Sequence, residues 1–426
     1  MDHFRYENNV LHCEQADLRA VAEEFGTPLY VYSKTTFLEH YQRLAEAFAP
    51  LSPMICYAVK SCHNLSILKI MKEQGAAFDI VSGGELARVL EVGGDPSRAV
   101  FAGVGKTDEE LCTAIEADIA WFNVESEEEL ENLARLAHRM GRTARAALRV
   151  NPDVDPKTHV YTTTGKRETK FGVDLDRARR VFAEFSGKPG LDLSAIHMHL
   201  GSPVNDIDPY VRSIEKTLTE LDRFKADGYE IKALNIGGGF GAHYDGEEAP
   251  PASAYAEQIV PMLKDSGLQI LMEPGRSIMA NAGILLCRVL YNKQSGDKKF
   301  VIVDGAMTEL IRPALYGSFH FAWPVEPAEN AVPPTRSASL QLDGSELVDI
   351  VGPVCESGDF LAKQRWLPPV KRGDLMCIYS AGAYGSVMAH QYNSRPRAAE
   401  VLVENDQVHL IRKRENYDDL VAAERL

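Results

Sequence analysis

Residues 53–60 read PMICYAVK, a short apolar run that ends on a lysine. Similar runs, rich in β-branched residues, recur downstream, and stretches with apolar residues at helical spacing separate them, as in residues 64–74 and 127–140. Thr107 or Asp108 is expected to cap a further helix over residues 109–117. The expected strands are residues 53–60, 78–82, 100–104, 121–125, 145–151, 195–200, 233–239 and 269–275.

Eight alternating units of this kind match the repeat of a (β/α)8 barrel, although a doubly wound open sheet shows the same alternation. We favour the barrel because polar and glycine residues fall at the carboxyl ends of several different strands. Active sites of barrel enzymes form at that end. We therefore expect an α/β domain of the (β/α)8, TIM-barrel type over residues 35–283.

The pattern changes in the last third of the chain. Strands are expected at residues 284–291, 300–304, 347–351, 375–379 and 399–411, with a hairpin turn between 403 and 408 and no long helices. Residues 28–33 (PLYVYS) also have the composition of a strand and are expected to join this module. Residues 1–34 and 284–426 are therefore expected to form an all-β domain resembling a sandwich or barrel.

Composition narrows the function classes. The chain has 426 residues, of which 45% are hydrophobic, and its net charge of −15 argues against a nucleic-acid or anionic-membrane partner. The 7 cysteines are scattered without a CxxC pair, which indicates reduced thiols. The first residues are polar and acidic, and no run approaches the roughly 18 apolar residues of a membrane span. We expect a cytoplasmic protein without a resident metal.

Three strand ends carry residues that are candidates for catalysis or cofactor binding. Lys60 ends the first strand, where a lysine is usually solvated, but a partly desolvated lysine is a nucleophile for aldehydes. The glycines at 237–239 either form a tight turn or bring backbone N–H groups close to a phosphate. Glu273, at the end of the eighth strand, either pairs with Arg276 on the surface or accepts a hydrogen bond from a protonated pyridine nitrogen.

His199 ends the sixth strand and is followed by Ser202. Because side chains alternate along a strand, His197 points to the same side as His199, and such a histidine is either a core residue or a flat surface for a cofactor. The Ser202 hydroxyl is a candidate phosphate ligand.

Two apparent nucleotide-binding motifs do not meet the requirements of the sites they resemble. No helix pattern opens on Gly237, Gly239 and Ala242, as the dinucleotide fingerprint requires, and the P-loop alignment that ends near Lys106 has Val100 where its first glycine belongs.

With these residues in this order, the chain resembles the fold III, alanine-racemase-type decarboxylases that use pyridoxal phosphate, and within them those that act on diaminopimelate. The similar stretches run in family order across nearly the whole chain. They are YAVK (57–60), FDIVSGGEL (78–86), FAGVGKT (101–107), KFG (170–172), HMHLGS (197–202), GGG (237–239), EPGR (273–276), RPALY (312–316), CESGD (355–359) and AYG (383–385).

The resemblance implies pyridoxal 5'-phosphate as cofactor and decarboxylation of meso-diaminopimelate to L-lysine. Lys60 would bind the cofactor aldehyde, and Cys355 would protonate the substrate Cα after carbon dioxide leaves. The other implied cofactor contacts are His199, Ser202, Gly237, Gly238, Gly239, Glu273, Gly275, Arg276 and Tyr384.

For the far end of the substrate, the resemblance implies that Arg276, Arg312 and Tyr316 bind the carboxylate. Guanidinium groups suit this because each holds a carboxylate with two hydrogen bonds. Glu356 would bind the distal ammonium, and Tyr384 would touch both cofactor and substrate. Cys355 and Glu356 would come from the partner subunit, so a homodimer with shared active sites is implied.

Plainer interpretations stand beside these. Cys355 can be a buried thiol, residues 312–316 a simple turn, and Asp79 and residues 170–172 structural. The chain departs from many relatives at His159, Val160 and Tyr161, where a proline usually follows the histidine.

Three other functions stay open. The same chemistry can act on carboxynorspermidine, ornithine, lysine or arginine, although the Cys-Glu-Ser loop with Arg312 and Tyr316 argues against them. A racemase needs a two-base arrangement. A non-catalytic regulator of this fold would be expected to lack Lys60 or Cys355, and both are present.

Overall fold

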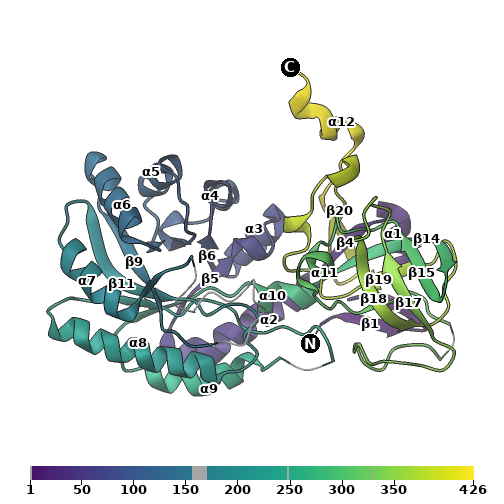
Figure 1. Ribbon diagram of the computed structural model, residues 1–426, viewed down its shortest axis with the longest axis horizontal. Helices are drawn as coiled ribbons and strands as arrows, with labels where there is room; N and C mark the ends of the chain where they lie inside the picture. Colours follow the sequence, from purple (N-terminus) through teal and green to yellow (C-terminus); the bar gives the residue numbers. More distant parts are fainter. Residues whose placement is uncertain (1, 156–169, 247–248, 329) are drawn as a thin grey trace. The chain divides into compact units, whose positions relative to one another are not determined.

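The computed structural model describes residues 2–155, 170–246, 249–328 and 330–426 (Figure 1). The chain divides into two compact units. The barrel unit comprises Tyr41–Gly241 and Ala249–Ser277, and the β unit comprises Met1–His40, Ala242–Glu248 and Ile278–Leu426. Each unit is described by itself below.

The barrel unit is a closed ring of eight parallel strands. Each expected strand is present, and the pairings of β13 with β5 and of β8 with β9 close the ring, which excludes the open sheet. A two-residue strand, β10 (Val173–Asp174), pairs with β9 outside the ring. The ring strands are β5 (Met54–Ala58), β6 (Ala77–Ile80), β7 (Ala99–Phe101), β8 (Trp121–Val124), β9 (Ala144–Asn151), β11 (Leu191–Met198), β12 (Ala233–Asn235) and β13 (Gln269–Met272).

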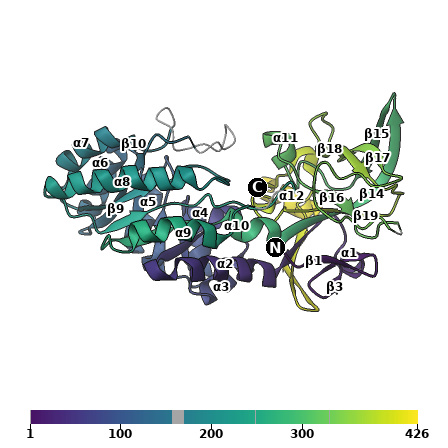
Figure 2. The ribbon, with the colours of Figure 1, turned by 90° about the horizontal axis from the view of Figure 1, so that it is seen from below.

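Helices cover the outside of this ring (Figures 1 and 2). Thr107, not Asp108, caps α5. Its side chain accepts a hydrogen bond from the backbone N–H of Glu110, and the Glu110 side chain accepts one from the backbone N–H of Thr107. The helices are α2 (Lys34–Phe48), α3 (Leu65–Glu73), α4 (Gly83–Glu91), α5 (Asp108–Glu116), α6 (Glu127–Arg139), α7 (Leu175–Phe185), α8 (Asp208–Ala226) and α9 (Ala252–Leu263).

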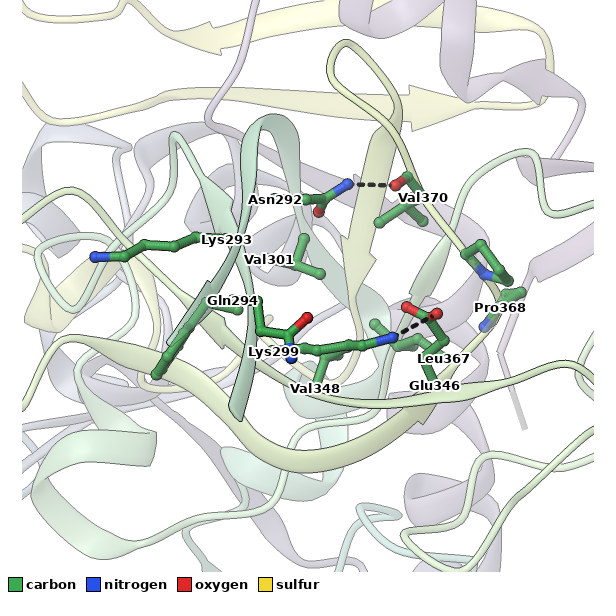
Figure 3. A pocket seen from close by; sticks show the side chains of 12 residues that line it. Asn292, Lys293, Gln294, Lys299, Val301, Glu346, Val348, Leu367, Pro368 and Val370 are labelled. Atoms are coloured by element: carbon green, nitrogen blue, oxygen red, sulfur yellow. Dashed lines mark hydrogen bonds and ion pairs between the residues drawn. The ribbon is translucent and has the colours of Figure 1, made fainter. Parts of the chain in front are cut away.

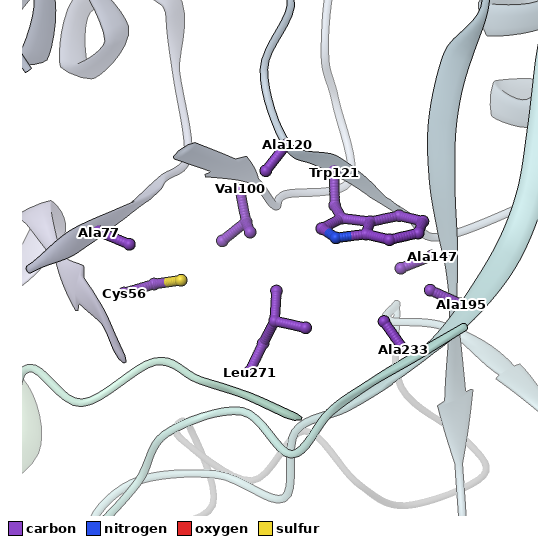
Figure 4. Close-up of a cluster of buried hydrophobic side chains, with 9 residues drawn as sticks. All are labelled: Cys56, Ala77, Val100, Ala120, Trp121, Ala147, Ala195, Ala233 and Leu271. Atoms are coloured by element: carbon purple, nitrogen blue, oxygen red, sulfur yellow. The ribbon is translucent and has the colours of Figure 1, made fainter. Parts of the chain in front are cut away.

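An apolar layer fills the barrel interior (Figure 4). Trp121 and Leu271 supply its bulk, and small side chains from other strands make room for them. The buried members are Cys56, Ala77, Val100, Ala120, Trp121, Ala147, Ala195, Ala233 and Leu271. Since side chains alternate along a strand, the residues two positions further on point inward as the next layer.

The β unit is built on a mixed sheet with strand order β18-β17-β15-β14-β4-β20-β21. The strand expected at residues 28–33 is present as β4, which pairs antiparallel with β14 and parallel with β20. The strands are β4 (Leu29–Ser33), β14 (Gly283–Ser295), β15 (Lys298–Val303), β16 (Ala322–Pro324), β17 (Glu346–Val351), β18 (Phe360–Leu367), β19 (Leu375–Ile378), β20 (Ala399–Glu404) and β21 (Gln407–Arg412).

Two of these strands, β16 and β18, have no counterpart in the sequence prediction. The hairpin predicted between residues 403 and 408 joins β20 to β21. A separate sheet of β1 (Phe4–Glu7), β2 (Val10–Cys13) and β3 (Ala16–Asp17) precedes α1 (Leu18–Phe25). The remaining helices are the short α10 (Arg276–Met279), α11 (Arg312–Tyr316) and α12 (Tyr417–Val421).

All 7 cysteines are free thiols in this structure. Among the described residues, no helix is both long and apolar enough to cross a membrane.

Candidate active site

The second inward layer of the barrel is polar. Its members lie two positions after members of the apolar layer, on six different strands or just past their ends. They are Asp79, Asn123, Arg149, His197, Asn235 and Glu273, and all are buried. An apolar floor with buried polar groups above it gives a low-dielectric site in which charges interact strongly.

Lys60 lies in the turn η2 (Val59–Ser61) directly after β5. Its Nζ is 2.5 Å from Oδ2 of Asp79, and within the described part of the chain Oδ1 of Asp79 has no hydrogen-bond partner. Burial raises the pKa of Asp79 to about 8, and the negative charge of Glu273 adds to this while Lys60 opposes it. Asp79, expected to be structural, therefore contacts the candidate nucleophile and can exchange a proton with it near neutral pH.

Glu273 follows β13 and is 5% exposed. Its Oε1 accepts hydrogen bonds from Nδ2 of Asn123 at 2.8 Å and from Nδ2 of Asn235 at 2.6 Å. Its Oε2 lies 3.5 Å from Nε2 of His197. Burial alone would raise the pKa of Glu273, but His197, Lys60 and the other nearby groups hold it below the ordinary value. Glu273 is thus an anion at neutral pH, in contrast to Asp79.

His199 follows β11 and is partly exposed, with its Nδ1 accepting the Gly238 N–H at 3.2 Å. Burial lowers the pKa of His199 well below 6.5, and the cations Arg149 and Lys60 lower it further. The ring is therefore neutral at pH 7 and carries its proton on Nε2. A neutral flat ring at this position suits stacking on an aromatic group.

The glycines after β12 are required by space as well as by conformation. Gly237 and Gly239 have φ of +70° and +100°. An added Cβ on Gly238 would lie 2.0 Å from the carbonyl oxygen of Glu273, and one on Gly239 would lie 2.1 Å from that of Gly201. Only glycine fits, so this turn brings its backbone close to neighbouring loops.

The loops after β11 and β13 meet beside these glycines. Nε of Arg276 donates to Oγ of Ser202 at 2.8 Å. A Cβ on Gly275 would lie 2.8 Å from the Ala58 side chain, so this turn too has no room for a side chain. The strand ends thus present glycine N–H groups, a hydroxyl and a guanidinium, which are typical phosphate ligands.

These residues fit pyridoxal phosphate. The glycines with Ser202 suit its phosphate, the anionic Glu273 suits its protonated ring nitrogen, and Lys60 suits its aldehyde. Arg149, which the sequence did not single out, adds a buried guanidinium whose Nε and Nη2 have no hydrogen-bond partner among the described residues.

Arg149 is held by Glu125 and by two residues of the KFG stretch that carries the resemblance. Its Nη1 donates to Oε1 of Glu125 at 2.9 Å, and its guanidinium lies 4.5 Å from the centre of the Phe171 ring. A Cβ on Gly172 would lie 2.9 Å from the Arg149 carbonyl oxygen. Phe171 and Gly172, for which a structural role was expected, therefore pack on a residue of the polar layer.

Lys106, rejected above as a P-loop lysine, has a structural place. Its Nζ is buried and donates to the carbonyl oxygens of Gly103 and Asn123 at 2.7 and 2.8 Å and to Glu129 at 2.5 Å. These contacts hold the end of β8, from which Asn123 reaches Glu273.

Of the predicted substrate residues, Arg276 lies in the barrel unit and the others lie in the β unit. Arg312 begins α11 and is buried, and the Tyr316 ring centre lies 5.8 Å from its guanidinium. Tyr384 has a φ of +56°, which is strained for a tyrosine and is a conformation that often marks functional positions.

Cys355 and Glu356 are exposed on a loop that is held at both ends. The Cys355 N–H donates to Oδ1 of Asn393 at 2.8 Å. The carboxylate of Asp359 accepts the N–H groups of Val354 and Met307, each at 2.7 Å. Cys355 is thus an accessible thiol on a fixed loop, not the buried thiol of the alternative interpretation. The departure at residues 159–161 lies outside the described residues.

A groove of about 220 Å³ elsewhere in the β unit contains none of these residues (Figure 3). It is lined by the hairpin of β14 and β15 together with residues 367–370, and an ion pair of Lys299 with Glu346 crosses it at 2.7 Å. We therefore do not regard this groove as a candidate active site.

Comparison with known proteins agrees with this geometry. Residues 34–280 match the family described as pyridoxal-dependent decarboxylase, pyridoxal binding domain. The chain is 45% identical to the diaminopimelate decarboxylase of Aquifex aeolicus, over 98% of this chain and 96% of that protein. It is also 45% identical to the diaminopimelate decarboxylase of Pseudomonas aeruginosa, over 100% and 99% of the two chains.

Solved structures are similar over the same length. The diaminopimelate decarboxylase of Helicobacter pylori complexed with L-lysine has a TM-score of 0.89 at 37% identity, covering 96% of this chain and 99% of that chain. The enzyme of M. jannaschii in complex with L-lysine has a TM-score of 0.91 at 33% identity, covering 100% and 98%.

Proposed function

The chain belongs to the family of pyridoxal-dependent decarboxylases, and we propose that it converts meso-2,6-diaminopimelate into L-lysine and carbon dioxide with pyridoxal 5'-phosphate as cofactor. One observation carries the proposal: a nucleophilic lysine, an anionic glutamate and a glycine cradle lie together at one barrel mouth. The full-length similarity to enzymes named diaminopimelate decarboxylase supports the choice of substrate.

Bound pyridoxal phosphate supplies an electron sink for the pair released when the bond from Cα to the carboxylate breaks. Glu273 would accept a hydrogen bond from the ring nitrogen and so hold a proton there. Lys60 would hold the cofactor at its aldehyde carbon, and Asp79, whose Oδ2 lies 2.5 Å from Nζ, would exchange protons with that nitrogen. The glycines at 237–239, Gly275 and Ser202 would bind the phosphate, and the neutral His199 would contact the ring.

The far end of the substrate is assigned to the remaining predicted residues. Arg276, Arg312 and Tyr316 bind its carboxylate, Glu356 binds its ammonium, and Tyr384 contacts substrate and cofactor. A plain diamino acid such as ornithine, which has no carboxylate at its far end, would leave the two guanidinium groups without a carboxylate, and this costs free energy at a desolvated site. The L-lysine complexes of the H. pylori and M. jannaschii enzymes support this assignment, because L-lysine retains that carboxylate.

We assign proton delivery to Cα to Cys355, and we propose a homodimer in which Cys355 and Glu356 serve the partner's barrel. The exposure of both residues on a fixed loop supports this. We further propose a cytoplasmic location and a cofactor-binding domain over residues 35–283, with residues 1–34 and 284–426 as the second domain.

The test is carbon dioxide release by the purified protein with added pyridoxal phosphate. Meso-diaminopimelate is compared with L-ornithine, L-lysine, L-arginine and carboxynorspermidine. Release from diaminopimelate alone is expected. Release from another substrate would keep the chemistry and refute the assignments of Arg276, Arg312 and Glu356, and no release with cofactor bound would favour a racemase or a regulator.

A further inference from the structure

The guanidinium of Arg312 is held by a small cluster within the β unit, the Arg312 cluster: Arg312, Tyr244, Ser318, His320 and Tyr379. Nε of Arg312 donates to Nε2 of His320 at 3.4 Å, and Nη2 donates to Oγ of Ser318 at 3.3 Å. The ring of Tyr244 lies 5.4 Å from the guanidinium carbon. The two hydrogen bonds at the edge of the guanidinium and the Tyr244 ring against its face fix the plane of the Arg312 guanidinium.

The backbone fixes the tautomer of His320. His320 is 1% exposed, and its Nδ1 lies 2.9 Å from the carbonyl oxygen of Tyr379. A carbonyl oxygen only accepts, so Nδ1 carries the proton and Nε2 of the neutral ring is an acceptor. Tyr244 packs edge-on against the same ring, with centroids 5.6 Å apart and planes at 88°. His320 therefore turns its lone pair toward Arg312.

A neutral acceptor has an advantage over a carboxylate at this position. A carboxylate beside Nε would orient the guanidinium but also neutralise it, and would compete with any carboxylate ligand for its charge. An imidazole orients the guanidinium and leaves the full positive charge for the ligand. The cluster thus has the properties of a preorganised carboxylate receptor.

We propose that His320 is a positioning residue, which aligns Arg312 for the carboxylate at the far end of the substrate and so selects amino acids over diamines. The inference rests on the proposed function, since it takes Arg312 as the carboxylate ligand. It adds a specificity determinant that touches neither substrate nor cofactor.

The experiment compares two competitive inhibitors, L-lysine and cadaverine, which differ by one carboxylate. Cofactor absorbance confirms loading of each variant. His320→Phe keeps a ring but removes both nitrogens, His320→Gln restores an acceptor near the position of Nε2, and His409→Phe, at an exposed histidine of β21, is the matched control. With His320→Phe, the inhibition constant of L-lysine is expected to rise about tenfold, as for loss of a hydrogen bond to a charged group.

The constant for cadaverine is expected to change less than about twofold, since cadaverine has no carboxylate to align. KM for diaminopimelate should rise while kcat stays nearly constant, and His320→Gln should recover most of the loss. Equal weakening of both inhibitors, or no change in either, would refute the positioning role.

If His320→Phe does not fold, His320→Gln is compared with His320→Asn, whose amide lies near the position of Nδ1, and only the Asn variant should lose selectivity for L-lysine. The failure of the proposed function is separable from these outcomes, because it would show as inactivity of the unmodified enzyme on diaminopimelate.

Discussion

Replacing Asn123 by aspartate should disable Glu273 while leaving the shape of the site unchanged. Asn123 is the most suitable position for this test, because its Nδ2 donates to Glu273 at 2.8 Å while no described residue donates a hydrogen bond to its Oδ1. Asn235 is less suitable, since its Oδ1 also accepts the Gly237 N–H at 2.9 Å. Asn123→Asp exchanges one donor for a second carboxylate and alters no other side-chain hydrogen bond to the described residues.

The magnitude follows from two effects. Loss of a hydrogen bond to a charged group costs about 1.5–3 kcal/mol, which raises the pKa of Glu273 by roughly 1–2 units. Two carboxylates about 4 Å apart repel by roughly 4 kcal/mol at an effective dielectric constant near 20, which adds about 3 units. The upper pKa of the pair therefore rises by about 4–5 units toward neutrality, and the fraction of pairs that share a proton grows as the pH falls below 7.

The assay is the pH dependence of kcat together with the absorbance of the bound cofactor, which reports protonation of the ring nitrogen. With Asn123→Asp, kcat at pH 7 should fall by about 10²- to 10³-fold, as for loss of one preorganised electrostatic contact. In Asn123→Leu, which only removes the donor, kcat should fall less. Asn132→Asp, at a half-buried asparagine of α6 whose Nδ2 donates to the carboxylate of Asp108, is the control. An unchanged absorbance and pH profile in Asn123→Asp would refute the role of Glu273 at the ring nitrogen.

Three further predictions concern separate contacts. Because the pKa of Asp79 is raised from 3.8 to about 8, the folded state binds that proton more tightly than the unfolded state, and wild-type stability is lost as pH rises through this window. In urea unfolding of the cofactor-free protein, Asp79→Asn should therefore gain stability relative to wild type between about pH 4 and pH 8. A difference in stability that does not depend on pH would contradict this. Gly238→Ala, whose Cβ would lie 2.0 Å from a carbonyl oxygen, should abolish cofactor binding in an absorbance titration, whereas Gly105→Ala, with nothing within 4 Å, should not. Mixing inactive Lys60→Ala and Cys355→Ala proteins should restore about a quarter of wild-type activity if sites are shared across a dimer, and no recovery after confirmed subunit exchange would exclude sharing.

The sequence predicted the barrel because its strands carry their own signal. Each strand is a short apolar run, and the ring closure follows from counting eight of them. The prediction missed β18 because residues 360–367 (FLAKQRWL) carry lysine and arginine in mid-strand, and the pairing of β18 with β17 is irregular. The β16 strand has three residues, which is too short for a periodicity.

The candidate site was only partly predictable. Lys60, Glu273 and the glycines follow strand ends and were found, but Asn123, Asn235 and Arg149 were not, because an asparagine or arginine inside a strand is usually a surface residue. A signal was present: each lies two positions after an apolar-layer residue, so it shares the inward side with Trp121, Ala233 or Ala147. The residues of the β unit carry no such signal, since no strand periodicity relates residues 312–316 or 355–359 to the barrel.

The apolar floor of the barrel contributes to the chemistry above it. Glu273 and Asp79 are both buried carboxylates in one layer, and burial alone would raise the pKa of each. Two amide donors and His197 act on Glu273, whereas Asp79 has Lys60 alone against burial and the charge of Glu273. Their opposite protonation states therefore come from unequal partners in one dry environment. The side chains of Trp121 and Leu271 exclude water from below the polar layer. Without water, a difference of a few hydrogen bonds is large enough to keep Asp79 protonated while Glu273 stays ionised.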